Sequence, residues 1–409
     1  MRNGSPLADA RDRHLAGLAQ RDRRLAYELS AGVLRRQREL DSILEIDRAD
    51  PRLHDVLRLG AYQLRWLTRV PPHAAVSTAV ELARETVGEA STGYVNRSLR
   101  KLSIIGHRPS DGEQTHPDWL VKRWTARLGA DETARLIDWN DKKPELIVQP
   151  ARWDQQMLIR LFREAGIEFD DAPFDAGLRL RPIANSRYPI AKDLPGFSAG
   201  AFIVQDPAHA LVARFASIPR GELVYDACAA PGGKAVALEA AGARVLAGEL
   251  HRDRLGRLTD TIHRAGVAIH TIAANLVAAP IRPNSLGAVL VDAPCSATGT
   301  MRRHPDARWR LEPGIFARAA ALQARLLDAA ATLVQPGGLL IYATCSLEPE
   351  ENADVVNAFL SRHPKFARSP LPPGSPVPAE LLTRAGDFQS LPHRHGIDGA
   401  YAARLVRTA

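Results

Sequence analysis

Two cysteines in the second half of the chain stand where an apolar run gives way to polar residues. Cys295 lies in DAPCSATGTMRRHPD (292–306) and Cys345 lies in GGLLIYATCSLEPEEN (337–352). A single cysteine in such a place is more often an inert core residue than a catalyst. These are two of only three cysteines in the chain, and one directly follows Asp-Ala-Pro. The pair therefore favours a shared chemical role.

Methylation of a pyrimidine at carbon 5 is a reaction that requires such thiols. Carbon 5 is a poor nucleophile until a thiolate adds to carbon 6 and makes the ring behave as an enamine. The ring then attacks a sulfonium methyl group, and loss of the carbon-5 proton expels the thiol. The attacking sulfur must be ionised, so it needs an electropositive and partly open setting. An acid near ring N3 would stabilise the intermediate, and Asp292 is the candidate, although chemistry alone does not decide which thiol attacks.

The segment DACAAPGGK (226–234) is a glycine-containing loop that follows another apolar run. Gly232 and Gly233 allow backbone amides to approach a ligand closely, and the helix N-terminus expected beyond them favours a negative group. The loop has neither the GxGxxG spacing of dinucleotide-binding turns nor the GxxxxGK[ST] spacing of phosphate-binding loops. A nicotinamide oxidoreductase on the same fold is therefore disfavoured.

Two further polar residues end the next two apolar runs. Glu249 could accept hydrogen bonds from both hydroxyls of a ribose. Asn275 could donate and accept at once, as an adenine edge requires. Each residue alone could be an ordinary turn residue. A glycine loop, an acid and an amide at three consecutive strand ends together predict S-adenosylmethionine as the cofactor.

From about residue 200 onward, apolar runs alternate with helical patterns. Near-continuous apolar strands separated by helices predict a parallel sheet that is covered on both faces. Such sheets bind ligands beyond the carboxyl ends of their strands, where all three cysteines lie. The helix before the last run is expected to end at Gly337 and Gly338. The runs are 222–228, 243–250, 268–275, 286–295 and 337–345.

The first half of the chain has a different rhythm. Residues 22–105 show apolar stripes at helical spacing and predict a small helical bundle with arginines on its exposed faces. That basic surface is either simply solvated or in contact with RNA. Residues 106–117 have the composition of a linker, and a mixed helix and strand region follows. The expected domains are 1–108, 117–199 and 200–409.

The overall composition bounds the class of protein. The 409 residues carry 54 Lys and Arg against 46 Asp and Glu, a net charge of +8. This excess is weak support for a nucleic-acid partner. The chain shows no secretory signal and no apolar run long enough to span a bilayer, so we expect a cytoplasmic protein without a membrane partner. The cysteines form no CxxC pair, which argues against a disulfide framework and against a metal site.

The motifs together resemble a known family. DACAAPGGK, DAPCSATGTMRRHPD and YATCSLEPEEN are similar to the signature motifs of the RNA 5-methylcytosine methyltransferases of the Sun/Fmu family. DRRLAYELSAGVLRR and YVNRSLRKL resemble the NusB-like RNA-binding domain of its RsmB-type members. HPDWLVKRW and LPGFSAGAFIVQDPAHALVA resemble the RRM-like middle segment and the entry to a Rossmann-like catalytic domain. The resemblance implies an all-α NusB-like bundle, a small α+β segment and an α/β methyltransferase domain.

The resemblance also implies roles for single residues. The family's nucleophile corresponds to Cys345, and the cysteine linked to release of the product corresponds to Cys295. Glu249 and Asp292 fall on the family's acidic positions near the cofactor, and Asn275 stands where the family usually has Asp. The family's S-adenosylmethionine loop corresponds to Cys228, Ala229, Ala230, Pro231, Gly232, Gly233 and Lys234.

The expected substrate is 16S ribosomal RNA, free or in a pre-ribosomal particle, and the expected state is a monomer. Arg302, Arg303 and His304 would contact the phosphates or the flipped target nucleotide, since the base must leave its stack to reach the thiol. A solvated basic loop is the alternative for these three residues. Two other functions stay open: the same chemistry on transfer RNA, and a catalytically silent RNA-binding assembly factor. The first helix of a NusB-like domain is expected to be missing before Leu15.

Overall fold

The computed structural model describes residues 6–15, 17–105, 115–182 and 190–408. Its contacts divide into two compact units. The helical unit comprises Met1–Lys142 together with Met301–Leu311, and the catalytic unit comprises Lys143–Thr300 together with Glu312–Ala409. The predicted linker, residues 106–117, lies outside the described residues except for its last three. Helices at 118–141 group with the N-terminal helices, whereas the expected middle domain began at 117; the domain boundaries stay a prediction.

The helical unit is built around a core of buried aliphatic side chains that includes Leu40, Leu57 and Leu99. Pro72 begins one of its helices, at a position where the missing N–H of proline costs nothing. The expectation that no helix precedes Leu15 is wrong, because the eight-residue helix α1 lies there. The helices are α1 (Leu7–His14), α2 (Gln20–Arg35), α3 (Gln37–Leu44), α4 (His54–Trp66), α5 (Pro72–Thr86), α6 (Thr92–Ile105), α7 (Asp118–Leu128), α8 (Ala130–Asp141) and α13 (Ala307–Arg310). Single 3-10 turns are η1 (Ile46–Arg48), η2 (Pro51–Leu53) and η3 (Glu89–Ser91).

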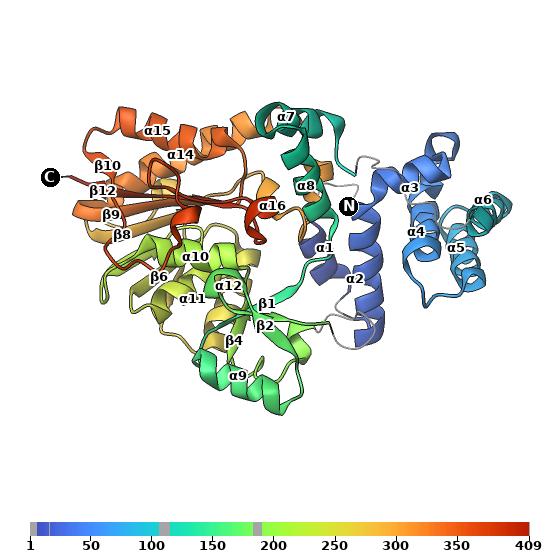
Figure 1. The fold of residues 1–409 in the computed structure, drawn as a ribbon, viewed down its shortest axis with the longest axis horizontal. Helices are drawn as coiled ribbons and strands as arrows, with labels where there is room; N and C mark the ends of the chain where they lie inside the picture. Colours follow the sequence, from blue (N-terminus) through green and yellow to red (C-terminus); the bar gives the residue numbers. More distant parts are fainter. Residues whose placement is uncertain (1–5, 16, 106–114, 183–189, 409) are drawn as a thin grey trace. The chain divides into compact units, whose positions relative to one another are not determined.

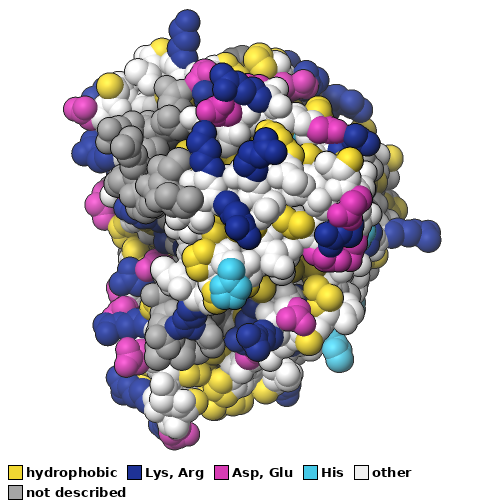
Figure 2. Space-filling view, turned by 90° about the vertical axis from the view of Figure 1, so that its right-hand side faces the viewer, with side chains coloured by type: hydrophobic (Ala, Val, Ile, Leu, Met, Phe, Trp, Pro, Cys, Tyr) yellow, Lys and Arg dark blue, Asp and Glu magenta, His cyan; other side chains and the backbone are white. Residues whose placement is uncertain are grey.

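Lys and Arg side chains are scattered over the face that Figure 2 shows, among acidic, hydrophobic and uncharged polar ones. On α6, Arg97, Arg100 and Lys101 are exposed. This matches the predicted helical bundle with basic exposed faces and leaves open what those faces contact.

The segment Met301–Leu311 is held inside the helical unit by a buried ion pair. Arg308 is fully buried, and its guanidinium donates a hydrogen bond of 2.9 Å to the carboxylate of Asp141. The same guanidinium donates to the backbone carbonyls of Thr115 and Asn140. Burial lowers the pKa of Arg308 to about 10, against the opposing effect of Asp141. The indole of Trp309 donates to the carbonyl of Leu34 at 2.6 Å, so the segment is an integral part of this unit.

The catalytic unit begins with a small antiparallel sheet in the order β2-β3-β1-β4. Its strands are β1 (Leu146–Pro150), β2 (Phe169–Asp171), β3 (Leu178–Leu180) and β4 (Phe202–Val204), and helix α9 (Gln155–Glu164) packs on them. Asp154 caps α9 by accepting from the amide of Met157 at 2.8 Å. Val148, Phe162 and Phe202 form the buried contact between helix and sheet. The predicted mixture of helix and strand is thus confirmed.

The large sheet has the order β10-β12-β9-β8-β5-β6-β7, with β11 paired to β12. The five strands predicted from apolar runs are present and mutually parallel. Strand β12 pairs antiparallel with β9, and it carries β10 and β11; this antiparallel edge was not predicted. The strands are β5 (Leu223–Asp226), β6 (Arg244–Glu249), β7 (His270–Ala273), β8 (Leu286–Asp292), β9 (Val334–Thr344), β10 (Phe366–Arg368), β11 (Phe388–Ser390) and β12 (Ala400–Arg407).

Helices cover both faces of this sheet, as expected for a buried parallel sheet. In Figure 1, α14 and α15 lie on one face of the sheet, and α10, α11 and α12 lie on the other. A cluster of buried apolar side chains packs the helices against the sheet on each face. The helices are α10 (Pro207–Ala216), α11 (Gly233–Ala240), α12 (Arg252–Ala265), α14 (Ile315–Leu333), α15 (Ala353–Arg362) and α16 (Pro392–His395). The 3-10 turns are η4 (Pro173–Asp175), η5 (Ala191–Asp193), η6 (Leu276–Ala278), η7 (Thr298–Thr300), η8 (Pro349–Glu351) and η9 (Ala379–Leu381).

The end of α14 differs from the sequence prediction. The helix ends at Leu333, and Gly337 and Gly338 lie within β9 instead of closing the helix. The register of β8 against β9 shifts between Leu286 and Ala288, so the glycines sit beside an irregular start of the strand pair. Among the helices of the described ranges, none combines the length and the apolar character needed to cross a membrane.

Candidate active site

The predicted site residues gather at one edge of the large sheet. Parallel strands end on the same side, so the residues that follow β5, β6 and β8 are neighbours there. The register pairs Asp226 with Ala247 and with Leu290, and pairs Asp292 with Ala343. Cys345 comes immediately after β9. The carboxyl edge therefore carries both predicted thiols, the predicted acid and the glycine loop.

The two thiols are in direct contact. The Sγ atoms of Cys295 and Cys345 are 3.2 Å apart, and both cysteines are free and partly exposed. Contact with Cys345, followed by burial, raises the pKa of the Cys295 thiol well above its ordinary value. Cys228, the third cysteine, also has a raised pKa, because it is buried and lies near carboxylates. Both Cys228 and Cys295 are therefore neutral thiols near neutral pH.

A buried ion pair lies beside the thiols. The ammonium of Lys234 donates to Asp292 Oδ2 at 2.7 Å and lies 3.2 Å from Nδ1 of His209. Burial alone would lower the pKa of Lys234, but the charge of Asp292 and the nearby Cys345 raise it. Lys234 is thus a fixed positive charge next to Cys345, which is the setting that a thiolate needs.

The glycine loop leads from β5 into α11. Gly232 has a φ of +108°, a conformation that residues with a side chain rarely adopt. A Cβ at Gly233 would lie 2.7 Å from the amide nitrogen of Gln205, so the backbone passes close to that side chain. The backbone amide of Ala229 donates a hydrogen bond of 2.9 Å to the carbonyl of Gly248. The loop is therefore fixed by the fold before any ligand binds.

The other predicted cofactor contacts lie at the ends of β6 and β7. Glu249 is buried, and its Oε1 accepts from the amide of His251 at 3.0 Å. Asn275 is exposed, and its Oδ1 accepts from the amide of Val277 at 3.1 Å, which caps η6. Both side chains close turns of their own loops. The role of each residue toward a cofactor stays a prediction.

Sequence reasoning did not single out Asp226, although it opens the glycine-loop motif. Asp226 is fully buried, and no side chain in the described ranges donates a hydrogen bond to either carboxylate oxygen. An unsatisfied buried carboxylate is costly, and a cationic ligand group would relieve that cost. S-adenosylmethionine carries an amino group and a sulfonium, both positive. The buried, unpaired carboxylate of Asp226 therefore fits a cofactor with positive groups.

The three residues predicted to contact RNA belong to the helical unit. The guanidinium of Arg302 is buried and lies 4.2 Å from the ring centre of Trp139. The backbone carbonyl of Arg302 accepts a hydrogen bond from Arg35. Arg303 is half-buried and His304 is exposed. Packing explains the position of Arg302, and the RNA-binding role of all three stays a prediction.

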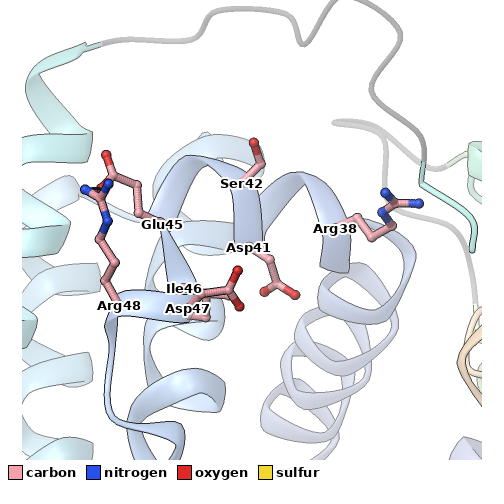
Figure 3. A pocket seen from close by; sticks show the side chains of 7 residues that line it. All are labelled: Arg38, Asp41, Ser42, Glu45, Ile46, Asp47 and Arg48. Carbon is pink, nitrogen blue, oxygen red and sulfur yellow. Dashed lines mark hydrogen bonds and ion pairs between the residues drawn. The ribbon is translucent and has the colours of Figure 1, made fainter. Parts of the chain in front are cut away.

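A pocket on the helical unit contains none of the predicted site residues (Figure 3). Two of its carboxylates are bonded to arginines: Asp41 accepts from Arg58 at 2.6 Å, and Glu45 accepts from Arg48. It holds no cysteine, histidine or lysine. We therefore do not assign chemistry to it. Nor do His, Cys, Asp and Glu side chains of the described residues group as a metal site would require. The lining residues are Arg38, Asp41, Ser42, Glu45, Ile46, Asp47 and Arg48.

Asp226 should make the stability of the cofactor-free protein depend on pH. Burial, reinforced by the charge of Asp292, raises the pKa of Asp226 to about 7 from 3.8. The folded state then holds the proton more tightly than the unfolded chain, so stability falls as pH rises from about 4 to about 7. Asp226→Asn removes this loss, because asparagine does not titrate. The difference in free energy of unfolding between the variant and the parent protein should therefore grow, in favour of the variant, by on the order of 4 kcal/mol as pH rises from about 4 to about 7.

Urea unfolding of the full chain at several pH values measures this difference. Asp260→Asn, which changes an exposed carboxylate on α12, is the control and should differ from the parent by a constant amount. A constant difference for Asp226→Asn as well would contradict the assignment.

Three sequence families describe successive parts of the chain. The NusB family matches residues 2–103, the ferredoxin-like domain of RsmF/B-like methyltransferases matches 116–185, and the 16S rRNA methyltransferase RsmB/F family matches 217–406. These matches confirm the predicted fold class of helical NusB-like, small α+β and Rossmann-like parts. The crystal structure of PH0851 has a TM-score of 0.79 and 27% identity, and the match covers 95% of this chain and 91% of that one.

Full-length relatives agree with these matches. The probable ribosomal RNA small subunit methyltransferase B of Synechocystis is 34% identical, over 95% of this chain and 92% of its own length. The ribosomal RNA small subunit methyltransferase B of Thermus thermophilus is 36% identical, over 95% and 89%. The family depends on S-adenosylmethionine, which confirms the predicted cofactor. With its three parts in the expected order and its length almost fully matched, the chain belongs to the RsmB/F family of 16S rRNA methyltransferases.

Proposed function

We propose that this protein methylates carbon 5 of a cytosine in 16S ribosomal RNA through a covalent bond between Cys345 Sγ and carbon 6 of the base. The observation that carries the proposal is the 3.2 Å contact of two free thiols at the carboxyl ends of β8 and β9. A methyltransferase that only positions a nucleophilic RNA atom needs no thiol. A pyrimidine carbon needs one to become nucleophilic.

The electrostatics favour Cys345 over Cys295 as the nucleophile. Lys234 is held in place by Asp292, and its charge interacts with Cys345, so Cys345 has a cationic neighbour at the sheet edge. A cationic neighbour is the setting in which nucleophilic cysteines are found. The raised pKa of Cys295 keeps that sulfur protonated. The sequence alone left the two thiols equivalent as chemical candidates, and the position of Lys234 near Cys345 supports the assignment made by resemblance.

The other residues at the sheet edge take supporting roles. Asp292, partly exposed and paired with Lys234, is proposed to face ring N3 of the base. Cys295 is proposed to act when the bond between Cys345 and carbon 6 breaks, because its sulfur is adjacent to that bond. When bound, S-adenosylmethionine supplies the methyl group as an electrophile. The loop Cys228–Lys234 would hold its amino-acid end, Glu249 its ribose and Asn275 its adenine.

The names of the relatives support small-subunit ribosomal RNA as the substrate, free or in a pre-ribosomal particle. The basic side chains of α6 are proposed to contact it. Three reduced cysteines suit a cytoplasmic enzyme. One chain supplies all the side chains assigned above, so we propose that the enzyme acts as a monomer.

Replacement of the nucleophile tests the chemistry directly. Cys345→Ala should abolish methyl transfer, by on the order of 10⁴-fold or more, because it removes the sulfur that adds to carbon 6. Cofactor affinity, measured by calorimetry, should stay within a few-fold, since the glycine loop and Glu249 are untouched. Retained turnover would remove Cys345 from its role.

Replacement of the second thiol should have a different signature. Cys295→Ala should leave the first addition intact and slow the release, so a protein–RNA adduct that survives denaturing gels should accumulate. The double replacement of both cysteines should form no adduct and serves as the control. Free RNA alone in the Cys295→Ala lanes would argue against a part in release.

Bisulfite mapping decides between the candidate substrates. In a strain that lacks this protein, one or more 5-methylcytosines should disappear from 16S ribosomal RNA and return when the gene is restored. Loss from transfer RNA instead would support the same chemistry on the alternative substrate. An unchanged methylation map in both RNAs would favour a silent assembly factor.

A further inference from the structure

We propose that Glu351 is a positioning residue whose buried carboxylate holds the two cysteine-bearing loops at the separation that the two thiols need. This inference rests on the proposed function for its purpose, although the geometry can be tested without RNA. Glu351 belongs to η8, six residues after Cys345 along the chain. No step of the reaction proposed above involves it.

The carboxylate of Glu351 is fully buried and binds both loops at once. On the Cys295 side, its Oε2 accepts from the amide of Ser296 at 2.9 Å and its Oε1 accepts from the Ser296 hydroxyl. On the Cys345 side, Oε1 accepts from the hydroxyl of Ser346 at 2.7 Å. Ser296 and Ser346 are the residues that directly follow the two cysteines. One carboxylate therefore contacts the next neighbour of each thiol.

A helix behind the loops completes this arrangement. The side-chain amide of Gln323, on α14, donates to Glu351 Oε2 at 3.0 Å and to the carbonyl of Pro294 at 3.0 Å. Pro294 directly precedes Cys295. The Cys295 loop is thus attached to Glu351 after its thiol, through Ser296, and to Gln323 before it, through Pro294. Gln323 in turn bonds Glu351.

Neutral hydrogen bonds also join the two loops. The amide of Gly299 donates to the carbonyl of Cys345 at 2.9 Å, and the amide of Leu347 donates to the hydroxyl of Thr298 at 2.8 Å. Of the groups that join the loops in these contacts, Glu351 alone is ionisable. Hydrogen bonds to an ionised acceptor are about twice as strong as neutral ones. Glu351 therefore adds a carboxylate that binds both loops to connections made by neutral backbone and hydroxyl groups.

A glutamine at this position keeps the shape of the side chain but not its charge. The carboxylate accepts on both oxygens, with the two N–H donors on Oε2 and the two serine hydroxyls on Oε1. With the oxygen of a glutamine toward the N–H donors, its NH₂ group would face the two hydroxyls, which would have to turn round and accept. The bonds to both loops then become neutral and weaker. The two loops are held less firmly, and the two sulfurs spend less time in contact.

The experiment measures that distance through the chemistry of the thiols themselves. The full-length parent, Glu351→Gln and Ser346→Ala are treated with diamide, an azo compound that takes one hydrogen from each of two thiols. The two sulfurs join in a disulfide while the azo group is reduced to a hydrazine. Peptide mapping without reduction gives the rate at which Cys295 and Cys345 become linked.

The parent protein should form this disulfide rapidly, because its sulfurs are already in contact. Glu351→Gln should slow the reaction by about tenfold or more, since reacting groups lose rate steeply when they are displaced by an ångström. Ser346→Ala removes one donor and keeps the buried charge bonded elsewhere, so it should fold and show a smaller slowing. Methyl transfer should fall in the same order while cofactor affinity is retained.

Asp387→Asn is the matched control for loss of a buried carboxylate. Asp387 is buried in the same unit, and its carboxylate accepts hydrogen bonds from Arg368 and Tyr401 instead of from a cysteine loop. Its disulfide should form at the parental rate. Equal slowing in Asp387→Asn, or an unchanged rate in Glu351→Gln, would overturn the positioning role. Failure of the parent to methylate cytosine would overturn the proposed function and leave the disulfide measurement valid.

Discussion

The parallel pairing of β8 with β9 is the constraint on which the site depends. It places Asp292 opposite Ala343, so that the loops that follow both strands leave the sheet side by side. Side chains alternate between the two faces of a strand. A slip of one residue in the pairing would therefore move the side chains at the end of the slipped strand to the opposite face of the sheet. The 3.2 Å contact of the two sulfurs therefore depends on a register fixed by backbone hydrogen bonds and by buried apolar side chains on both faces.

The same sheet edge concentrates negative charge. Asp226, Glu249 and Asp292 lie at the ends of three strands, and Lys234 is the cation bonded among them. This balance suits a cofactor with two positive centres, and it suits a lysine that stays charged although it is buried. The charge of the lysine also interacts with Cys345, so the charges around the cofactor site and the cysteine site are linked through one side chain.

Local sequence patterns predicted the parts of the fold that depend on local information. Five apolar runs gave five parallel strands, and the motifs at their ends gave the cysteines, Asp292 and the glycine loop. The antiparallel strand β12 was missed because its arginines, Arg404 and Arg407, interrupt the apolar pattern; in the structure they bond to Ser369 and Asn284. Such partners are far away in sequence and leave no local signal.

Two polar residues show the same limit more sharply. Arg302 reads as an exposed basic residue, but the ring of Trp139, more than 160 positions earlier, covers it. Glu351 lies in an acidic stretch, LEPEE, that reads as solvated surface. It is buried because Ser296 of the distant Cys295 loop, Gln323 of α14 and the nearby Ser346 donate to its carboxylate. The residues that could react were visible in the sequence, whereas those that fix their separation were not.

The segment Met301–Leu311 gives the molecule an unusual connectivity. The chain leaves the catalytic unit after Thr300, contributes Arg308 and Trp309 to the helical unit, and re-enters at Glu312. The two units therefore share three backbone crossings instead of one. A shortened protein that began at residue 143 would keep this segment but lose Asp141 and Leu34. The guanidinium of Arg308 and the indole of Trp309 would then lack these hydrogen-bond partners. The helical unit is thus not a detachable module, and exchange of this unit between relatives must carry the eleven-residue insertion with it.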